Sequence, residues 1–226
     1  SLMGIESDKP LISKAILDLN FTNEGGVEGT TRFLKNIMGM WLLQECRRSW
    51  SHKVNYSWSE MVDLSTLSQP FKCLIDPDDP SFLNPADMPQ AIIDFCLKTD
   101  QPKPETHGEF IRCIFESLAM KYRLTLDSIR SVISYPIDIV HIIGGGANNE
   151  LLCQYSANAL QLPVKAGPTE ATAIGNILIQ AKAMKAVASL EEIRTMVGES
   201  FGTKTFLPSE ADVWKVQFER FRRIVN

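Results

Sequence analysis

The chain of 226 residues lacks the features that mark several large classes of protein. No apolar run approaches the roughly 18 to 20 residues that a membrane-spanning helix needs, and the first residues form neither a basic stretch nor an apolar signal core. Lys and Arg number 23 against 27 Asp and Glu, so the basic excess of a typical nucleic-acid binder is lacking. These absences predict a cytoplasmic protein that binds neither nucleic acid nor a membrane.

Cysteine and histidine are too sparse to suggest a metal site. The five cysteines contain no C-x-x-C pair, which excludes a zinc ribbon, and the three histidines lie far apart in the sequence. An odd, low cysteine count is typical of a reducing compartment. Cys96 ends one predicted helix and Cys113 begins the next, so an antiparallel helix hairpin would bring them together. The sequence leaves open whether these two cysteines form a disulfide or remain two buried thiols.

The start of the chain is predicted to form a strand, a glycine-rich turn and a long helix. Leu17, Leu19 and Phe21 alternate with polar residues, which indicates a half-buried strand. The turn follows at residues 23–31, and Thr30 or Thr31 is expected to cap a helix over residues 32–48. The apolar arc of that helix is wide, so it is expected to be buried on most sides.

Three residues inside the predicted helix form a polar stripe. Asn36, Met40 and Gln44 fall at positions i, i+4 and i+8, so Asn36 and Gln44 would lie roughly 12 Å apart along the axis. The spacing alone favours an exposed polar edge.

Helices dominate the middle of the chain. Capping boxes open two of them, Ser57-x-x-Glu60 for a helix that ends before Pro70 and Thr106-x-x-Glu109 for a long helix to about residue 133. A further helix is expected at residues 89–97. Aspartates and prolines cluster at residues 76–80, which is ordinary turn chemistry and lacks the ligand pattern of a calcium-binding loop.

The last third reads as a parallel α/β layer. Residues 138–143 form a β-branched apolar run that fits a central strand covered on both faces, with His141 as a buried side chain. A helix over residues 150–160, a short strand at residues 163–166 and another helix follow, in the order typical of parallel strands joined by helices. A short, charged helix is expected at the C-terminus.

The best chemical signal is the triple glycine that follows the apolar strand. Glycines there let a ligand approach the backbone, and the next helix offers free N–H groups at its N-terminus. The dinucleotide-binding fingerprint fails because Asn149 stands at its third glycine, and no Gly-Lys-Ser/Thr follows to make a Walker A loop. No G-x-S-x-G elbow is present either. The glycines alone are consistent with a nucleotide site or with a tight turn.

Several segments together resemble the FGGY family of carbohydrate kinases, in particular its branch that acts on L-rhamnulose. The resemblance covers essentially the whole chain. Its motifs are NEGGVEG at residues 23–29, LKNIMGMWLLQ at 34–44, FLNP at 82–85, HIIGGG at 141–146 and GPTEATAIGN at 167–176.

This resemblance implies an α/β lobe of the actin-like ATPase (ribonuclease H-like) fold, with a mixed sheet flanked by helices and a helical insertion at about residues 50–135. It implies an enzyme that transfers the γ-phosphoryl group of ATP to the 1-hydroxyl of L-rhamnulose, with Mg²⁺. ATP would lie between two lobes, of which residues 1–226 would be the C-terminal, nucleotide-binding one.

The resemblance also assigns ligand contacts to individual residues. The adenosine motif of the family falls on Gly144, Gly145, Gly146 and Asn148, with Gly145 the most direct contact. Gln44 matches an ATP-contacting position and Asn36 a substrate-contacting one. Ala171, Ala173 and Gly175 match a small-residue segment through which a helix packs closely near the connection between the lobes.

The family's catalytic Asp, its phosphate loops and most sugar contacts belong to a part upstream of Ser1. The expectation is that this chain carries no catalytic residue and no metal ligand, and that it is inactive without its N-terminal lobe, because phosphoryl transfer needs groups converging on the γ-phosphate. Two alternatives stay open. One is a non-catalytic module that binds a nucleotide or a protein, and the other is a kinase for a related ketose.

Overall fold

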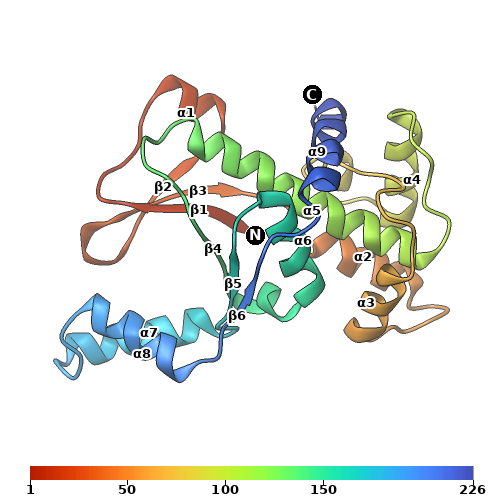
Figure 1. The fold of residues 1–226 in the computed structure, drawn as a ribbon. Coiled ribbons are helices and arrows are strands. Elements are labelled where there is room, and N and C mark those ends of the chain that lie inside the picture. The colour runs from red at the N-terminus through yellow and green to blue at the C-terminus, as the bar shows by residue number, and fades with distance from the viewer. Residues whose placement is uncertain (226) are drawn as a thin grey trace. The chain divides into compact units, whose positions relative to one another are not determined.

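The computed structural model describes residues 1–225, which form two compact units. The first unit contains residues 1–136 and the C-terminal segment from Asp212, and the second contains residues 137–211. Figure 1 shows the elements of each unit. Because the second unit is inserted between two parts of the first, the chain leaves the first unit and returns to it.

A three-stranded antiparallel sheet begins the first unit. Strand β3 (Thr31–Asn36) lies between β1 (Leu2–Ser7) and β2 (Thr22–Gly25), with Leu2 opposite Asn36 and Thr22 opposite Leu34. Helix α1 (Lys14–Asp18) connects β1 to β2, and the 3₁₀ turn η1 (Val27–Gly29) connects β2 to β3.

This sheet corrects two predictions for the start of the chain. Leu17 lies on α1 and is 75% exposed, so the half-buried strand predicted around it is wrong, although Phe21 is buried and stacks on Phe33 with ring centroids 4.5 Å apart. The helix predicted over residues 32–48 is also wrong in its first half. Residues 31–34 have a partner strand on each side and residues 35–36 pair with β1, and this pairing overrides the helical spacing of their apolar side chains.

Five helices complete the first unit, and the longest forms its core. They are α2 (Trp41–Trp50), α3 (Trp58–Thr66), α4 (Met88–Lys98), α5 (His107–Arg130) and α9 (Ala211–Val225). Fifteen of the 24 residues of α5 are buried, and α5 packs against α2, α3 and β1. Both predicted capping boxes are confirmed, since Ser57 and Thr106 each exchange hydrogen bonds with the glutamate three residues later.

The aspartate-rich passage before α4 forms turns, as predicted. The Asp79 carboxylate accepts the Ser81 amide and caps the short 3₁₀ helix η2 (Pro80–Phe82). Asp87 caps α4 in the same way through the Gln90 amide.

The cysteines at issue lie in the core. All five cysteines of the chain are buried and free, so the structure has no disulfide between Cys96 and Cys113.

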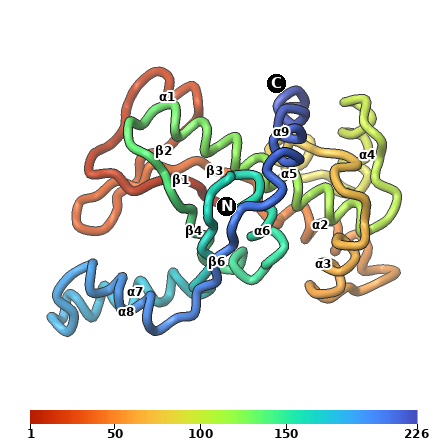
Figure 2. The backbone as a smooth tube through the Cα atoms, viewed as in Figure 1, coloured from red at the N-terminus to blue at the C-terminus, as the bar shows by residue number. Residues whose placement is uncertain are grey.

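The C-terminal helix α9 is fastened to the first unit by one arginine. The Arg220 guanidinium donates to the carbonyl of Phe71 at 2.7 Å, to the carbonyl of Lys72 at 3.3 Å and to Gln101 Oε1 at 2.7 Å. Figures 1 and 2 show α9 beside α5, and the Arg123 guanidinium of α5 lies over the Phe218 ring of α9. The last helix thus packs with residues 71–123 from the middle of the sequence.

The second unit is a small α/β layer. Its sheet has the order β4 (Val140–Ile142), β5 (Val164–Ala166) and β6 (Lys204–Phe206). The 3₁₀ turn η3 (Gly144–Asn148) and helix α6 (Glu150–Leu160) join β4 to β5, and helices α7 (Ala171–Ala183) and α8 (Leu190–Ser200) join β5 to β6. The parallel pairing of β4 with β5 confirms the predicted layer, while β6 runs antiparallel to β5.

Strand β4 departs from its prediction. It is shorter than predicted and, in the part of the chain that the structure describes, it pairs with one neighbour, β5. His141 is exposed on it, so the predicted buried histidine is wrong. In the described residues no helix combines the length and the apolar character that crossing a membrane requires.

Candidate functional site

The turn after β4 has the geometry of a ligand-binding loop. Gly144 has a φ of +75°, a conformation that glycine adopts without steric cost, and its amide donates to the Pro168 carbonyl at 3.1 Å. The turn is therefore fixed to the segment after β5, so that the carboxyl ends of two parallel strands lead into the same region. Ligands of open α/β sheets bind at this edge.

Gly145 and Gly146 are not required by packing within the chain. A Cβ at Gly145 would meet no atom within 4 Å, and a Cβ at Gly146 would meet only the Ile142 Cγ2 atom, at 3.7 Å. Neither residue has a positive φ. The chain thus leaves bare backbone next to open space, which suits close approach of a ligand.

Helix α6 begins directly behind this turn. The Asn149 side chain caps it by accepting the Leu152 amide at 3.0 Å. Below the turn, the Cys153 thiol lies 3.8 Å from the Gly146 carbonyl oxygen and 3.9 Å from that of Ala147. Burial, with a smaller effect of the Glu150 charge, raises the pKa of Cys153 to about 11. This thiol is neutral at pH 7 and supports the turn rather than acting as a nucleophile.

The segment after β5 forms the opposite wall. Gly167 has a φ of +106°, precedes a cis proline and donates its amide to the Ile142 carbonyl at 2.9 Å. A Cβ at Gly167 would lie 3.0 Å from the Gly202 carbonyl oxygen, so this glycine is required by the fold itself. Thr169 follows, and its hydroxyl donates to Asn148 Oδ1 at 2.9 Å, which links the two walls.

An ion pair closes one end of the site. Lys204 Nζ on β6 lies 2.6 Å from Glu150 Oε2 at the start of α6, and it also lies 5.4 Å from the Phe206 ring centroid. Both charged side chains are more than half exposed, so the pair contributes little to stability and can exchange partners with a ligand.

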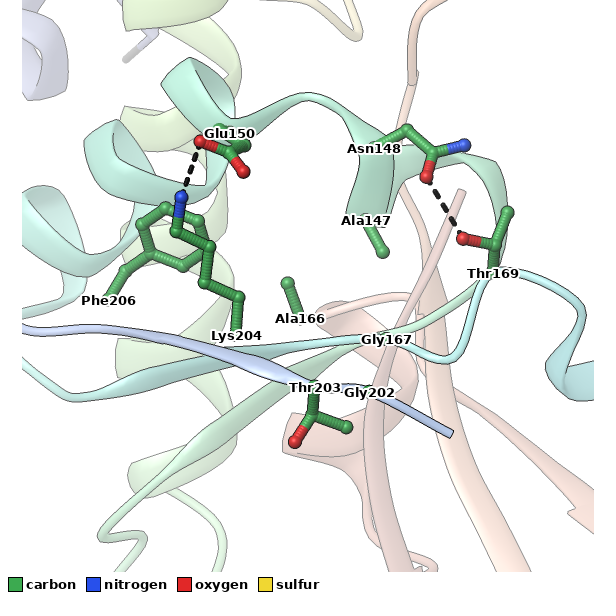
Figure 3. A pocket seen from close by; sticks show the side chains of 10 residues that line it. All are labelled: Ala147, Asn148, Glu150, Ala166, Gly167, Thr169, Gly202, Thr203, Lys204 and Phe206. Carbon is green, nitrogen blue, oxygen red and sulfur yellow. Dashed lines mark hydrogen bonds and ion pairs between the residues drawn. The ribbon is translucent and has the colours of Figure 1, made fainter. Parts of the chain in front are cut away.

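These elements enclose a pocket of about 270 Å³ in the second unit (Figure 3). Its lining includes Asn148, Glu150, Gly167, Thr169, Lys204 and Phe206. Figure 3 shows the hydrogen bond between Asn148 and Thr169 on one side and the Lys204–Glu150 pair on the other, around small residues such as Ala166. The site offers hydrogen-bond donors and acceptors, a cation and an aromatic face around accessible backbone.

The predicted site residues lie in different parts of the structure. Asn148 lines the pocket, and residues 144–146 lead into it without forming its wall. Asn36 and Gln44 belong to the first unit, where both are exposed. They do not share one helix, because Asn36 ends β3 and Gln44 lies in the first turns of α2. The polar stripe predicted on spacing, with its distance of roughly 12 Å, is therefore wrong.

The sequence does not predict four polar residues of the pocket, Glu150, Thr169, Thr203 and Lys204. Thr169 lies in the motif at residues 167–176, which assigns it no contact, and the sequence marks Glu150 only as the first residue of a predicted helix. Lys204 lies on a strand of three residues, which is too short for an alternating pattern to reveal. The pairing of β6 with β5 brings it to the pocket, and no local signal reports that pairing.

Comparison with known proteins places these features in a family. Residues 1–184 match the model described as the FGGY family of carbohydrate kinases, C-terminal domain. The chain is 48% identical over 226 residues to a rhamnulokinase of Bacteroides thetaiotaomicron, covering all of this chain and 46% of that protein. It is 40% identical over 212 residues to a rhamnulokinase of Bacillus subtilis, covering 94% of this chain and 43% of that protein. The chain thus spans about half the length of the curated relatives it matches.

Solved structures show the same fold. A gluconate kinase from Lactobacillus acidophilus superposes with a TM-score of 0.70 at 14% identity, covering 99% of this chain and 44% of that one. Plasmodium falciparum glycerol kinase with ADP gives a TM-score of 0.67 at 13% identity over the same shares. The expected α/β lobe of the actin-like ATPase fold is confirmed. The chain belongs to the FGGY family of carbohydrate kinases and corresponds to its C-terminal domain.

Proposed function

We propose that the turn at residues 144–148 binds the nucleotide of a sugar kinase. The observation that carries this proposal is the open backbone at Gly145, which follows a parallel strand, precedes a helix and has no neighbour that would exclude a side chain. Such a glycine is explained by a ligand that must come close to the backbone. Asn148 and Thr169 add polar groups beside it, and Gln44 of the first unit is proposed as a further nucleotide contact.

The residues present fit an adenine nucleotide. Backbone N–H groups and the positive end of the α6 dipole favour phosphate oxygens. Phe206 and the Lys204–Glu150 pair offer an aromatic face and hydrogen-bonding groups. ATP would supply the transferable γ-phosphoryl group. The role of this chain's residues is to bind and orient it, which is the larger part of catalysis in phosphoryl transfer.

The proposed sugar substrate is L-rhamnulose, phosphorylated on its 1-hydroxyl. This assignment is supported by the names of the relatives, which are 48% and 40% identical over nearly the whole chain. Asn36 is proposed to contact the ligand from the end of β3. Mg²⁺ is proposed to arrive with ATP, because that ion is usually held by substrate phosphates together with one or two carboxylates.

We infer that residues 1–226 form the C-terminal, nucleotide-binding lobe and that residues 50–135 are a helical insertion within it. Helices α3, α4 and α5 fall in that range. We also infer that the lobe is inactive by itself and requires its N-terminal lobe. Groups on both sides of the γ-phosphate must converge for transfer to occur.

The test uses the full-length protein with ATP, Mg²⁺ and a panel of ketoses, and NMR of the product identifies the phosphorylated hydroxyl. We expect L-rhamnulose to give the highest kcat/KM and the product to carry phosphate on C1. Preference for another ketose would change the proposed substrate but leave the proposed kinase activity unchanged. Turnover by the 226-residue chain alone would contradict the two-lobe requirement. No turnover of any sugar, with a different protein captured instead, would favour a non-catalytic module.

The nucleotide site is tested by Gly145→Ala in the full-length protein. We expect the nucleotide KM to rise about tenfold, because the new methyl group occupies space that packing leaves open and the ligand needs. The thermal midpoint should stay unchanged for the same reason. Gly198→Ala on α8 is the matched control, since a Cβ there also meets nothing within 4 Å. Equal KM values for both variants would remove Gly145 from the site.

A further inference from the structure

The connection between β3 and α2, residues 37–40, lies between the two proposed ligand contacts of the first unit. Asn36 precedes it and Gln44 follows it by one turn of α2. The start of α2 has no side-chain cap and no acidic residue in its first turn. Because helix ends of this kind leave N–H groups without a local partner, the geometry of this connection depends on groups from elsewhere in the chain.

Asp78, forty residues further along the chain, provides such a group. Its Oδ1 atom accepts the Met38 amide at 2.7 Å, and its Oδ2 atom lies 3.0 Å from Lys121 Nζ on α5. The two oxygens of one carboxylate therefore join the β3–α2 connection to the central helix of the unit. A hydrogen bond to an ionised carboxylate is roughly twice as strong as one between neutral groups.

The loop that carries Asp78 is itself fixed to α5. The Ile75 amide donates to the Ser117 hydroxyl at 2.9 Å, and Asp76 Oδ1 lies 2.8 Å from Lys121 Nζ. Asp76 also accepts the Asp78 amide at 3.1 Å. Two contacts with α5 thus lie just before Asp78 in the sequence and fix the loop from which its carboxylate reaches the connection.

Lys121 anchors this arrangement, because its ammonium group contacts both Asp76 and Asp78. Its residue surface is only 8% exposed, and its two carboxylate partners raise its pKa against the opposing effect of burial. The Lys35 ammonium lies close enough for its pKa to be lowered, chiefly by burial and then by the charge of Lys121. Lys35 is thus a second cation near the carboxylates of Asp76 and Asp78.

We propose that Asp78 is a positioning residue of the ligand site, which holds residues 37–40 so that Asn36 and Gln44 present their side chains at fixed places. This inference rests on the proposed function, because it takes those two side chains as ligand contacts. Asp78 acts through Met38 and touches no ligand. Small displacements of positioning elements reduce the rate of phosphoryl transfer strongly, since orientation supplies much of the catalysis.

The experiment compares three variants of the full-length protein in steady-state kinetics and in amide hydrogen exchange. Asp78→Ala removes both bonds, and Asp78→Asn keeps an oxygen for the Met38 amide while it removes the charge that pairs with Lys121. Asp79→Ala is the matched control, because Asp79 lies in the same loop and bonds only to Ser81 among the contacts described above.

We expect Asp78→Ala to raise the KM for nucleotide or ketose about tenfold and to speed exchange at residues 37–44. We expect Asp78→Asn to fall between this variant and wild type, so it carries the test if the alanine variant does not fold. Asp79→Ala should keep the wild-type KM, even if its thermal midpoint falls.

Failure can be assigned to one proposal or the other. If wild type is active and both Asp78 variants keep the wild-type KM and the wild-type exchange at residues 37–44, the positioning role is overturned. If both variants lose stability to the same extent as Asp79→Ala and show the same KM, Asp78 has a structural role only. If wild type neither binds nucleotide nor phosphorylates any ketose, the proposed function fails, whatever the exchange of residues 37–44 shows.

Discussion

The two units of this chain differ in how tightly each is packed internally. The first is built on α5, where fifteen buried residues meet helices and a strand, and where charged side chains such as Glu116 and Lys121 are buried with partners. In the second unit, α7 has no buried residue, and apolar side chains such as Ile177 are exposed on it.

This difference matches a difference in the proposed roles. Side chains that are fixed from several directions can hold ligand contacts at defined places, as Asp78 does for residues 37–40. A small sheet that ends in glycine turns leaves backbone accessible instead, as at Gly145. The first unit thus has positioned side chains, and the second has open backbone.

The comparison between the units predicts its largest effect when one core side chain is removed. Phe115 on α5 is fully buried, and Phe115→Ala should lower the free energy of unfolding by about 3–5 kcal/mol. Ile177→Ala on α7 removes a side chain that is 65% exposed and should change it by less than about 0.5 kcal/mol. Chemical denaturation followed by circular dichroism measures both. Similar losses would show that α7 is packed in solution and would weaken the contrast.

A smaller effect is expected from pH. Burial raises the pKa of Glu116 to about 7, against the opposing effects of the Arg112 ion pair and the Phe71 amide. Because the folded state holds this proton more tightly than the unfolded state, the contribution of Glu116 to stability is greatest below about pH 4.5. It is lost as pH rises through about 7.

The measurement is the free energy of unfolding between pH 4.5 and 8. Glu116→Gln should flatten its downward slope over that range. Glu191→Gln, at an exposed position of α8, matches the charge change and should leave the slope as in wild type. A slope that survives Glu116→Gln would assign the titration to another group.

The smallest effects are expected at helix caps. Thr106 caps α5 and Ser189 caps α8, each through the amide three residues later. Thr106→Ala and Ser189→Ala should each cost about 1 kcal/mol. Hydrogen exchange should show the first loss across the core of the first unit, because α5 packs against several elements. The loss of protection caused by Ser189→Ala should be confined to α8. A loss at Thr106 confined to the first turn of α5 would argue against a single cooperative core.

The sequence predicted those elements whose signals are local. Both capping boxes, the helix at residues 150–160 and the parallel pair β4 and β5 follow from residue types at short spacing. The strand at residues 31–36 could not be predicted in this way. Phe33 and Leu34 fit a helix and a strand equally, and only pairing with β1 and β2 decides between them.

Only part of the candidate site could be predicted, because only some of its residues have a local signal in the sequence. The glycines at 144–146 stand out in the sequence, while Lys204 reaches the pocket through a pairing across 38 residues that leaves no local trace. The resemblance to a family identifies Asn36 and Gln44 as site residues, whereas only the spacing predicts that they lie on one helix. The resemblance survives the correction of that helix, because it depends on residue identity and not on secondary structure.

The three hydrogen bonds of Arg220 have a consequence for biosynthesis. They join α9 to residues 71–72 and 101, so the first unit cannot complete its core until α9 has left the ribosome. The second unit, which is continuous in sequence, is free to fold earlier. During translation, the apolar surface that Trp214, Phe218 and Phe221 of α9 cover stays exposed until α9 has been made.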